Sequence, residues 1–351
     1  MGGPSGLPFL LLVGFEGGKG RLLDISLIAS QVTPTPVGKG FSMLIKSEYD
    51  IQFHLPLPTP MVAMLHLHPS LEPAVRAGNQ LKVEHIDRDT KTDVATSDFR
   101  DVFGNRCTRF TTPAGAIRLS GTNVLEMEAK PDPINAYAQQ ATVENLPSEV
   151  LQFLLPSRYC EVDRFVPIAQ DLFGWMTPGW TRVSAIRDWV HEKVAFNYQA
   201  ARPTKTAMDV FTERVGVCRD YQHLAITLSR CQNIPARYVT GYLGDIRWPY
   251  SGPGDFSAWY EVFLDGRWMT MDARHNNPRM GRVLMATGRD AADVAITTSF
   301  GNAILTNFYV DSYEVREDGT TVPSLPGSVA QEAVVTSANR GSAGAIQGVA
   351  E

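Results

Sequence analysis

The stretch VGVCRDYQHLAITLSRCQNIPARYVTGYL, residues 215–243, decides the fold. Apolar residues recur at helical spacing after Cys218 and predict a helix from there to about Cys231. Its predicted buried stripe consists of Tyr221, Leu224, Ala225 and Leu228. Asn233-Ile234-Pro235 ends the helix, and residues 237–243 then read as a strand. A turn, a helix that begins at a cysteine and a strand therefore follow one another.

A β-hairpin is predicted about fifty residues further on. Asp265-Gly266, a strong hairpin signal, joins predicted strands at 257–264 and 267–273. If these two residues form the loop, Trp259 lies opposite Asp272. Position 257 is then diagonal to Asp272, within reach of a long side chain. The residue at this position is Ser257.

A cysteine at the start of a helix is suited to nucleophilic chemistry. The unpaired N–H groups and the dipole of the helix stabilise a thiolate, so we expect the pKa of Cys218 to be lowered toward neutrality. The same N–H groups can hold an oxyanion. Taken alone, Cys218 fits an ordinary core cysteine equally well.

Four motifs in order carry a resemblance to a known family. They are Gly216-Val217-Cys218-Arg219-Asp220, the run at 234–242, Ser257-Ala258-Trp259-Tyr260-Glu261-Val262, and Arg267-Trp268 followed by Asp272. Together they resemble the transglutaminase-like core of bacterial cysteine-protease-type proteins, over about residues 160–300. The resemblance implies a papain-like site in which Cys218 attacks an amide carbonyl, a histidine shuttles the proton and Asp272 orients that histidine.

The family's histidine position is occupied by Ser257, which has no side-chain base near neutral pH. His223 lies about 140° around the helix from Cys218 and is predicted to be structural. His275 lies three residues after Asp272 and would point to the opposite face of a regular strand, but a turn at 273–274 would remove that objection. Three alternatives stay open: His275 as substitute base, activation of Cys218 by the helix alone, or a descendant that has lost catalysis.

The rest of the chain supports an α+β, papain-like core preceded by a β-sandwich-like N-terminal domain. Short strands are predicted at 49–55, 61–68, 81–86, 106–111, 116–119 and 124–129. Thr181 is the predicted N-cap of one helix, and Thr206 with Asp209 forms a capping-box signal for another. The predicted division is a poorly ordered extension at 1–42, the β-rich domain at 43–130, a linker at 131–158, the transglutaminase-like core at 159–318 and a disordered tail at 319–351.

Composition limits the partners and the compartment. The chain has 351 residues and a net charge of −5, with basic residues scattered, so nucleic acid binding is not expected. Four dispersed cysteines without a CxxC pair favour reduced thiols and a cytoplasmic protein, and the resemblance implies a bacterial one. The apolar run at 7–15 is a poor signal peptide and too short to span a bilayer, so no membrane association is expected. The oligomeric state is not predicted.

Other candidate sites are weaker. His66 and His68 share a strand face and His54 precedes them, but no ligand set at metal spacing accompanies them, and no metal is predicted. Asp220 and Asp255 flank the predicted site and serve either substrate binding or capping.

The sequence therefore predicts a cysteine-dependent amide or peptide hydrolase, or an acyl transferase, that works through a Cys218 thioester without a cofactor. Cys218, Asp272 and His275 are the predicted catalytic residues, and Ser257 and Trp259 are predicted to contact a peptide or protein substrate. Two other readings remain: a catalytically impaired domain that binds peptides, and an esterase-type acyl transferase for small molecules.

Overall fold

The described part of the chain comprises residues 42–88 and 90–326 of a computed structural model. The chain divides into two units, Met1–Gly40 and Phe41–Glu351, and all that follows concerns the second. The predicted extension at 1–42 lies outside the described residues except for Ser42, and so does residue 327 onward of the predicted tail. Among the helices of the described ranges, none has the length and apolar character of a membrane span.

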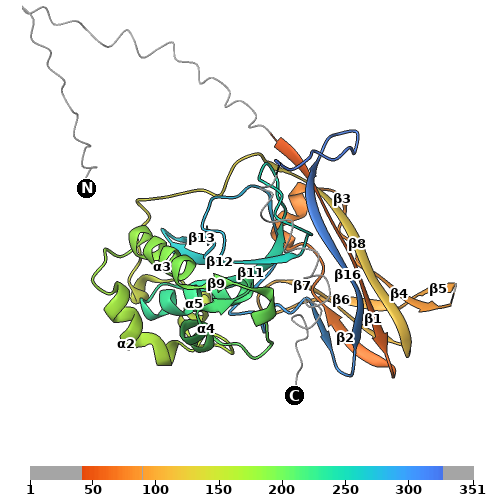
Figure 1. Ribbon diagram of the computed structural model, residues 1–351, viewed down its shortest axis with the longest axis horizontal. Coiled ribbons are helices and arrows are strands. Elements are labelled where there is room, and N and C mark those ends of the chain that lie inside the picture. The colour runs from red at the N-terminus through yellow and green to blue at the C-terminus, as the bar shows by residue number, and fades with distance from the viewer. Residues whose placement is uncertain (1–41, 89, 327–351) are drawn as a thin grey trace, which may run out of the picture. The chain divides into compact units, whose positions relative to one another are not determined.

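The first sheet contains the long antiparallel strands of the N-terminal region (Figure 1). Its order is β16-β1-β8-β4-β5, and β3 also pairs with β8. The bounds are β1 (Ser42–Leu55), β3 (Val75–Gly78), β4 (Lys82–Asp87), β5 (Thr90–Asp93), β8 (Gly115–Glu128) and β16 (Ile304–Val315). Alternate residues of β1 are buried, as the hydrophobic alternation of a sheet with one covered face requires.

A second sheet shares the core of the first. Its order is β15-β2-β7-β6, from β2 (Thr59–Ala63), β6 (Thr96–Arg100), β7 (Arg106–Thr112) and β15 (Thr297–Ser299). Ile45 and Leu119 of the first sheet belong to the same buried cluster as Met61 and Phe110 of the second. The β-rich N-terminal region predicted from the sequence is therefore present.

Two features of these sheets differ from the expectation. The predicted strands at 116–119 and 124–129 form one strand, β8, because Gly121 does not turn the chain; a Cβ at Gly121 would lie 2.5 Å from the Tyr49 hydroxyl oxygen, so glycine admits a close approach. In addition, β15 pairs with β2 and β16 pairs with β1, so strands from the end of the described chain complete both sheets. Sheet closure thus joins residues on both sides of the predicted boundaries at 130 and 159.

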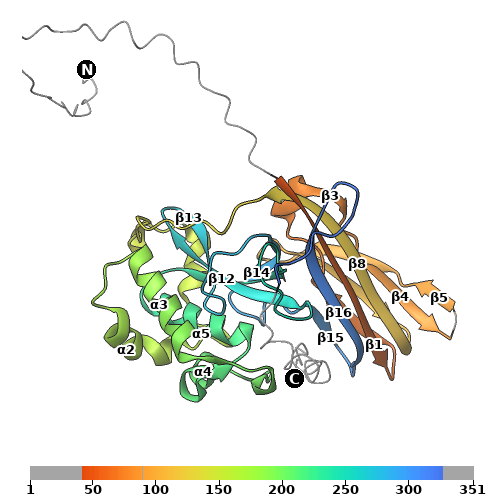
Figure 2. The ribbon, with the colours of Figure 1, turned by 45° about the horizontal axis from the view of Figure 1, so that its top comes forward.

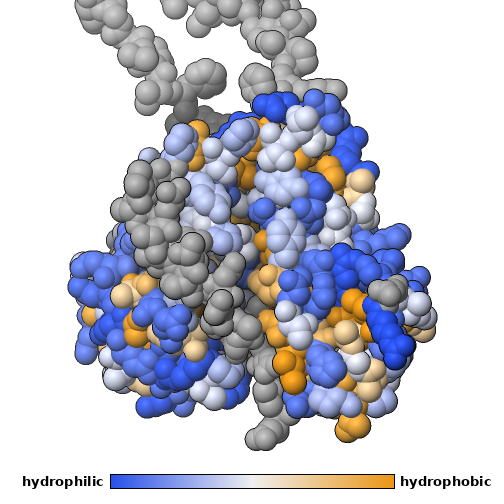
Figure 3. Space-filling view, turned by 45° about the vertical axis from the view of Figure 1, so that its right-hand side comes forward, coloured by the Kyte–Doolittle hydropathy of each residue, from blue (hydrophilic) through white to orange (hydrophobic). Residues whose placement is uncertain are grey.

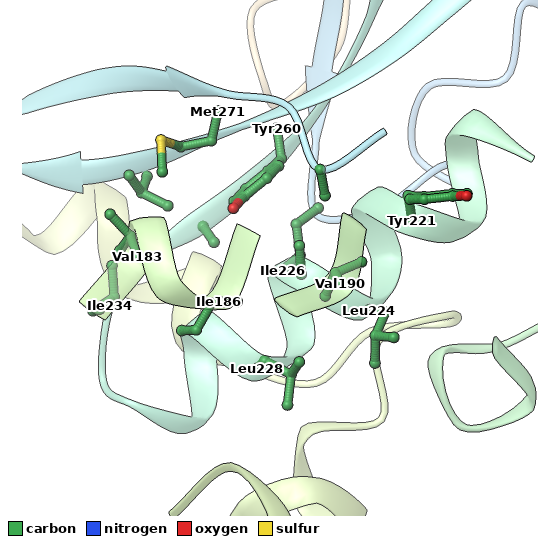
Figure 4. Close-up of a cluster of buried hydrophobic side chains, with 14 of the residues drawn as sticks. Val183, Ile186, Val190, Tyr221, Leu224, Ile226, Leu228, Ile234, Tyr260 and Met271 are labelled. Atoms are coloured by element: carbon green, nitrogen blue, oxygen red, sulfur yellow. The ribbon is translucent and has the colours of Figure 1, made fainter. Parts of the chain in front are cut away.

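The helical part covers a third sheet, as Figures 1 and 2 show. The α-helices are α1 (Ser148–Leu151), α2 (Val162–Phe173), α3 (Trp180–Lys193), α4 (Ala207–Glu213) and α5 (Cys218–Cys231). Short 3₁₀ helices are η2 (Pro69–Ala74), η3 (Val143–Asn145), η4 (Gln152–Leu154) and η5 (Tyr198–Ala200), and a two-stranded ribbon pairs β9 (Ala195–Phe196) with β10 (Val215–Gly216). Side chains from α3, α5 and the third sheet form the core drawn in Figure 4.

The predicted helix ends are largely reproduced. The capping box of Thr206 and Asp209 is confirmed, and so are both ends of α5. The predicted N-cap Thr181 is wrong: α3 begins at Trp180, after Gly179 with φ of 99°, where a Cβ would lie 2.3 Å from the Ala138 carbonyl oxygen. Burial of α5 also extends around the helix from Asp220 to Arg230, beyond the predicted stripe.

The third sheet has the order β13-β12-β11-β14. Its strands are β11 (Ala236–Leu243), β12 (Phe256–Leu264), β13 (Arg267–Met271) and β14 (Arg282–Gly288). The predicted hairpin register is confirmed, with Leu264 paired to Arg267. On the face seen in Figure 3 the described surface is mainly hydrophilic with small hydrophobic groups between, as expected when most large apolar side chains lie in the cores.

Candidate active site

Cys218 is the first residue of α5. Val217 before it is extended, and its N–H donates to the Asp220 carboxylate at 3.0 Å. A Cβ on Gly216 would lie 2.7 Å from the Asp220 side chain, so the turn needs glycine. Asp220 is fully buried and therefore fixes the helix start.

The thiol of Cys218 is partly buried and lies among polar groups. Burial raises the pKa of Cys218 to about 11, the Asp255 carboxylate adds to the rise, and the Arg274 guanidinium opposes it. The lowered pKa expected from the helix start is therefore wrong, because desolvation and Asp255 outweigh the contribution of the helix. Near neutral pH the thiol keeps its proton and needs a base.

Gln222 connects this helix to Asp272. It lies one turn after Cys218 and thus on the same side of α5. Its Nε2 donates to Asp272 Oδ1 at 3.2 Å and to the Ala258 carbonyl at 3.1 Å, while its Oε1 accepts from the Ala273 N–H at 3.2 Å. Sequence reasoning missed Gln222, although its spacing from Cys218 is a signal.

Asp272 and His275, hereafter the Asp–His pair, are in direct contact. His275 Nδ1 lies 2.9 Å from Asp272 Oδ2, and the backbone N–H of His275 donates to Asp272 Oδ1 at 3.0 Å. The contact is possible because β13 ends at Met271 and the chain turns, with the Asn276 N–H bonded to the Asp272 carbonyl at 3.0 Å. The turn considered for residues 273–274 is thus present.

Charges around the Asp–His pair set its protonation. Burial opposes ionisation of Asp272, but Arg282 Nη2 at 3.0 Å and His275 outweigh it and hold the pKa of Asp272 well below its usual range. Burial lowers the pKa of His275 more than Asp272 raises it, and Arg274 and Arg279 lower it further. At neutral pH this leaves an ionised carboxylate and a neutral imidazole.

Arg274 contacts the outer side of that imidazole. Its Nη1 lies 2.5 Å from His275 Nε2, and its guanidinium carbon lies 3.9 Å from the centre of the Phe196 ring. The backbone N–H of Arg274 donates to Asp272 Oδ1 at 3.0 Å. Sequence reasoning missed this residue, since an arginine next to a histidine carries no signal of its own.

Ser257 and Trp259 lie on β12 as predicted. Ser257 is half-buried and pairs with Gly241 of β11. Trp259 is only 2% exposed, and Arg282 lies over its ring at 5.1 Å. In this arrangement Trp259 supports the arginine that binds Asp272.

Asp255 and Tyr198, from other elements, interact electrostatically with Cys218. Burial raises the pKa of Asp255 to about 7, against a backbone hydrogen bond from Phe256 and the charge of Arg274. Burial together with Asp255 and Cys218 raises the pKa of Tyr198 to about 12. Both residues therefore act on the same site as the thiol.

Of the remaining histidines, His191 on α3 contacts the Ala273 and Arg274 carbonyls beside this site, whereas His223 and His66 lie within cores. His223 is buried and stacked on Tyr159 with ring centres 4.9 Å apart, and its Nε2 accepts from the Ala291 N–H at 3.1 Å, in keeping with the structural role predicted for it. His66 Nε2 bonds the Thr108 hydroxyl at 2.7 Å. Within residues 42–88 and 90–326, no group of three histidine, cysteine or acidic side chains is placed to hold a metal ion.

Comparisons with known proteins identify the fold. Residues 167–273 match the model of the transglutaminase-like superfamily, which confirms the resemblance seen in the sequence. A crystal structure of a protein from Cytophaga hutchinsonii, named "Putative Cysteine Protease", is similar with a TM-score of 0.70 and 29% identity, over 83% of this chain and 96% of that chain. An uncharacterized protein of Mycobacterium leprae (strain TN) is 26% identical over 58% of this chain and 76% of its own length. The chain thus has an α+β transglutaminase-like fold with a β-rich N-terminal region.

Proposed function

We propose that the protein is a cysteine-dependent amide or peptide hydrolase, or an acyl transferase, that forms a thioester at Cys218. The observation that carries this proposal is the Asp–His pair at 2.9 Å, tied through Gln222 to the helix that begins at Cys218. An imidazole oriented by a carboxylate supplies the base that Ser257 cannot provide. The resemblance to the Cytophaga hutchinsonii protein supports the same class of reaction.

The reaction follows from these groups. His275 Nε2 takes the thiol proton while the sulfur attacks the acyl carbon, and Asp272 stabilises the imidazolium that results. Backbone N–H groups at the start of α5 stabilise the oxyanion, each contributing on the order of 3 kcal/mol. The protonated imidazole then delivers its proton to the leaving amine, and water or a second amine resolves the thioester. These steps require no cofactor.

Turnover of a fluorogenic peptide amide tests the proposal. We expect Cys218→Ala to abolish turnover and His275→Gln to lower kcat/KM by about 100-fold or more, because both remove a group that moves in the chemical step. Cys231→Ala, at the other end of the same helix, is the matched control and should retain activity. Full activity in His275→Ala would remove His275 from the mechanism.

A second candidate is a peptide-binding module without catalysis. The thiol pKa of about 11 and the occupied Nε2 of His275 favour this alternative. Equal peptide affinity for the wild-type protein and Cys218→Ala, without turnover by either, would support it. We also propose a cytoplasmic location, supported by free cysteines at positions 107, 160, 218 and 231. The resemblance to the Cytophaga hutchinsonii protein supports a bacterial source, and the proposed reaction implies a peptide or protein partner.

A further inference from the structure

The proton-accepting nitrogen of His275 is engaged by Arg274. Asp272 is ionised and only accepts hydrogen bonds, so His275 Nδ1 carries the hydrogen of their 2.9 Å contact. The neutral imidazole then has its lone pair on Nε2, and a guanidinium only donates. The 2.5 Å contact from Arg274 Nη1 therefore occupies the lone pair that has to take the thiol proton.

The Arg274 side chain keeps one hydrogen-bond donor without a partner among the described residues, whereas its backbone is fully engaged. The backbone N–H of Arg274 donates to Asp272, and its carbonyl oxygen lies 2.9 Å from Nδ1 of His191 on α3. These two contacts hold the turn in place. By contrast, the buried Nε of Arg274 meets no acceptor in residues 42–88 and 90–326. A buried donor without a partner costs about 1–3 kcal/mol, which favours a new acceptor. The charge of the guanidinium also opposes the rise in the pKa of the Cys218 thiol, so the two groups belong to the same site.

We propose that Arg274 is a positioning residue that covers Nε2 of His275 in the free protein and moves to a carbonyl oxygen of the bound acyl substrate, which exposes the base. This inference rests on the proposed function. When the guanidinium leaves, the S–H proton passes to Nε2, the new S–C bond forms, and the carbonyl electron pair moves to the oxygen that the guanidinium then faces. Substrate binding and availability of the base are thereby coupled.

Several charged groups bear on His275 and enter any titration of it. Asp272, Arg274 and Arg279 come from the same segment of chain as the imidazole. Arg282 of β14 acts through its ion pair with Asp272, and Asp132 binds Arg282 in turn at 2.9 Å. His191 on α3 contacts the carbonyls of residues 273 and 274. Of these groups, only Arg274 bonds Nε2.

The test follows the His275 imidazole directly by ¹⁵N NMR of histidine-labelled full-length protein, with its signals assigned by their loss in His275→Gln. We expect Arg274→Gln to raise the pKa of His275 by about one unit or more, since a cation leaves Nε2. Arg274→Lys keeps the charge and should give a smaller rise. Arg267→Gln, an exposed arginine of the hairpin, is the matched control and should give none. An unchanged pKa in Arg274→Gln would overturn the proposal.

The movement to a carbonyl is tested with iodoacetamide as the probe. Alkylation of Cys218 at about pH 9 or above places an amide carbonyl beside the sulfur. In alkylated wild-type protein we expect the His275 pKa to rise as in Arg274→Gln, and no further rise in alkylated Arg274→Gln. A His275 pKa unmoved by alkylation would contradict the coupling. Neither measurement needs turnover. A protein without amidase activity would refute the proposed function, whereas the His275 titrations by NMR would still decide whether Arg274 covers Nε2.

Discussion

The position of Cys218 at a helix start and its surroundings shift the pKa of its thiol in opposite directions. The start of α5 supplies N–H groups that favour a thiolate, whereas burial and the Asp255 carboxylate favour the thiol. Burial and Asp255 have the larger effect on the thiol pKa, so the sulfur is protonated near neutral pH. Under the proposed function, a base takes the proton of such a thiol during attack, and the Asp–His pair fills that role.

Replacing Asp255 by asparagine should activate the thiol. Asp255 is largely ionised above its pKa of about 7, and its negative charge raises the pKa of Cys218. Removing that charge lowers the thiol pKa, so a larger fraction is thiolate at any pH below about 11. We expect Asp255→Asn to be alkylated by iodoacetamide about 3- to 10-fold faster at pH 8–9, corresponding to a pKa shift of about half to one unit.

The pH profile of alkylation, read by mass spectrometry at Cys218, checks this expectation. Asp171→Asn, an exposed residue of α2, serves as the control and should follow the wild-type curve. Identical profiles for Asp255→Asn and wild type would mean that Asp255 does not act on the sulfur.

At the scale of elements, local signals and long-range contacts explain what the sequence did and did not reveal. The ends of α5, the capping box of α4 and the Asp265-Gly266 hairpin depend on neighbouring residues, and the sequence predicted all three. The placement of Asp272 followed from the hairpin register. Gln222, Arg274 and Arg282 were missed because their contacts arise only when α5, the turn after β13 and β14 meet.

The single strand β8 supplies a test at this scale. A Cβ at Gly121 would lie within 2.7 Å of the Tyr49 ring, so Gly121→Ala forces β1 and β8 apart locally. We expect a loss of about 1–3 kcal/mol in the free energy of unfolding, measured with urea. The double variant Tyr49→Leu/Gly121→Ala should lose less than the two single changes together, because the clash is then absent. Additive losses would assign the cost to something other than this contact.

At the scale of the whole molecule, the β-rich region depends on strands from the far end of the described chain. Leu44 pairs with Val315 and Ala63 pairs with Thr297, so β16 and β15 complete sheets begun by β1 and β2. The transglutaminase-like core lies between them in sequence. The two N-terminal sheets are therefore complete only when the segment that follows the core in sequence has paired with them.

A charge in β16 should consequently destabilise the N-terminal sheet. Val310 is 2% exposed and lies in the cluster shared by the two β-sheets. We expect Val310→Asp to lower the free energy of unfolding by about 3 kcal/mol or more, because it buries an unpaired carboxylate. Thr306→Asp, at an exposed position of the same strand, should change it by less than about 0.5 kcal/mol. Urea titration followed by near-UV circular dichroism measures the free energy of unfolding of both variants. Equal values for Val310→Asp and Thr306→Asp would show that β16 does not contribute to the core.

The pairing of Leu44 with Val315 also has a consequence for synthesis on the ribosome. Translation releases β1 before its partner β16, so one long edge of β1 stays without hydrogen bonds until residues 304–315 have emerged. Open strand edges recruit other chains, and the nascent protein needs shielding there by a chaperone or by rapid pairing with β8. Hydrogen bonding along this edge of β1 therefore waits for β16, whatever the speed at which the helices form.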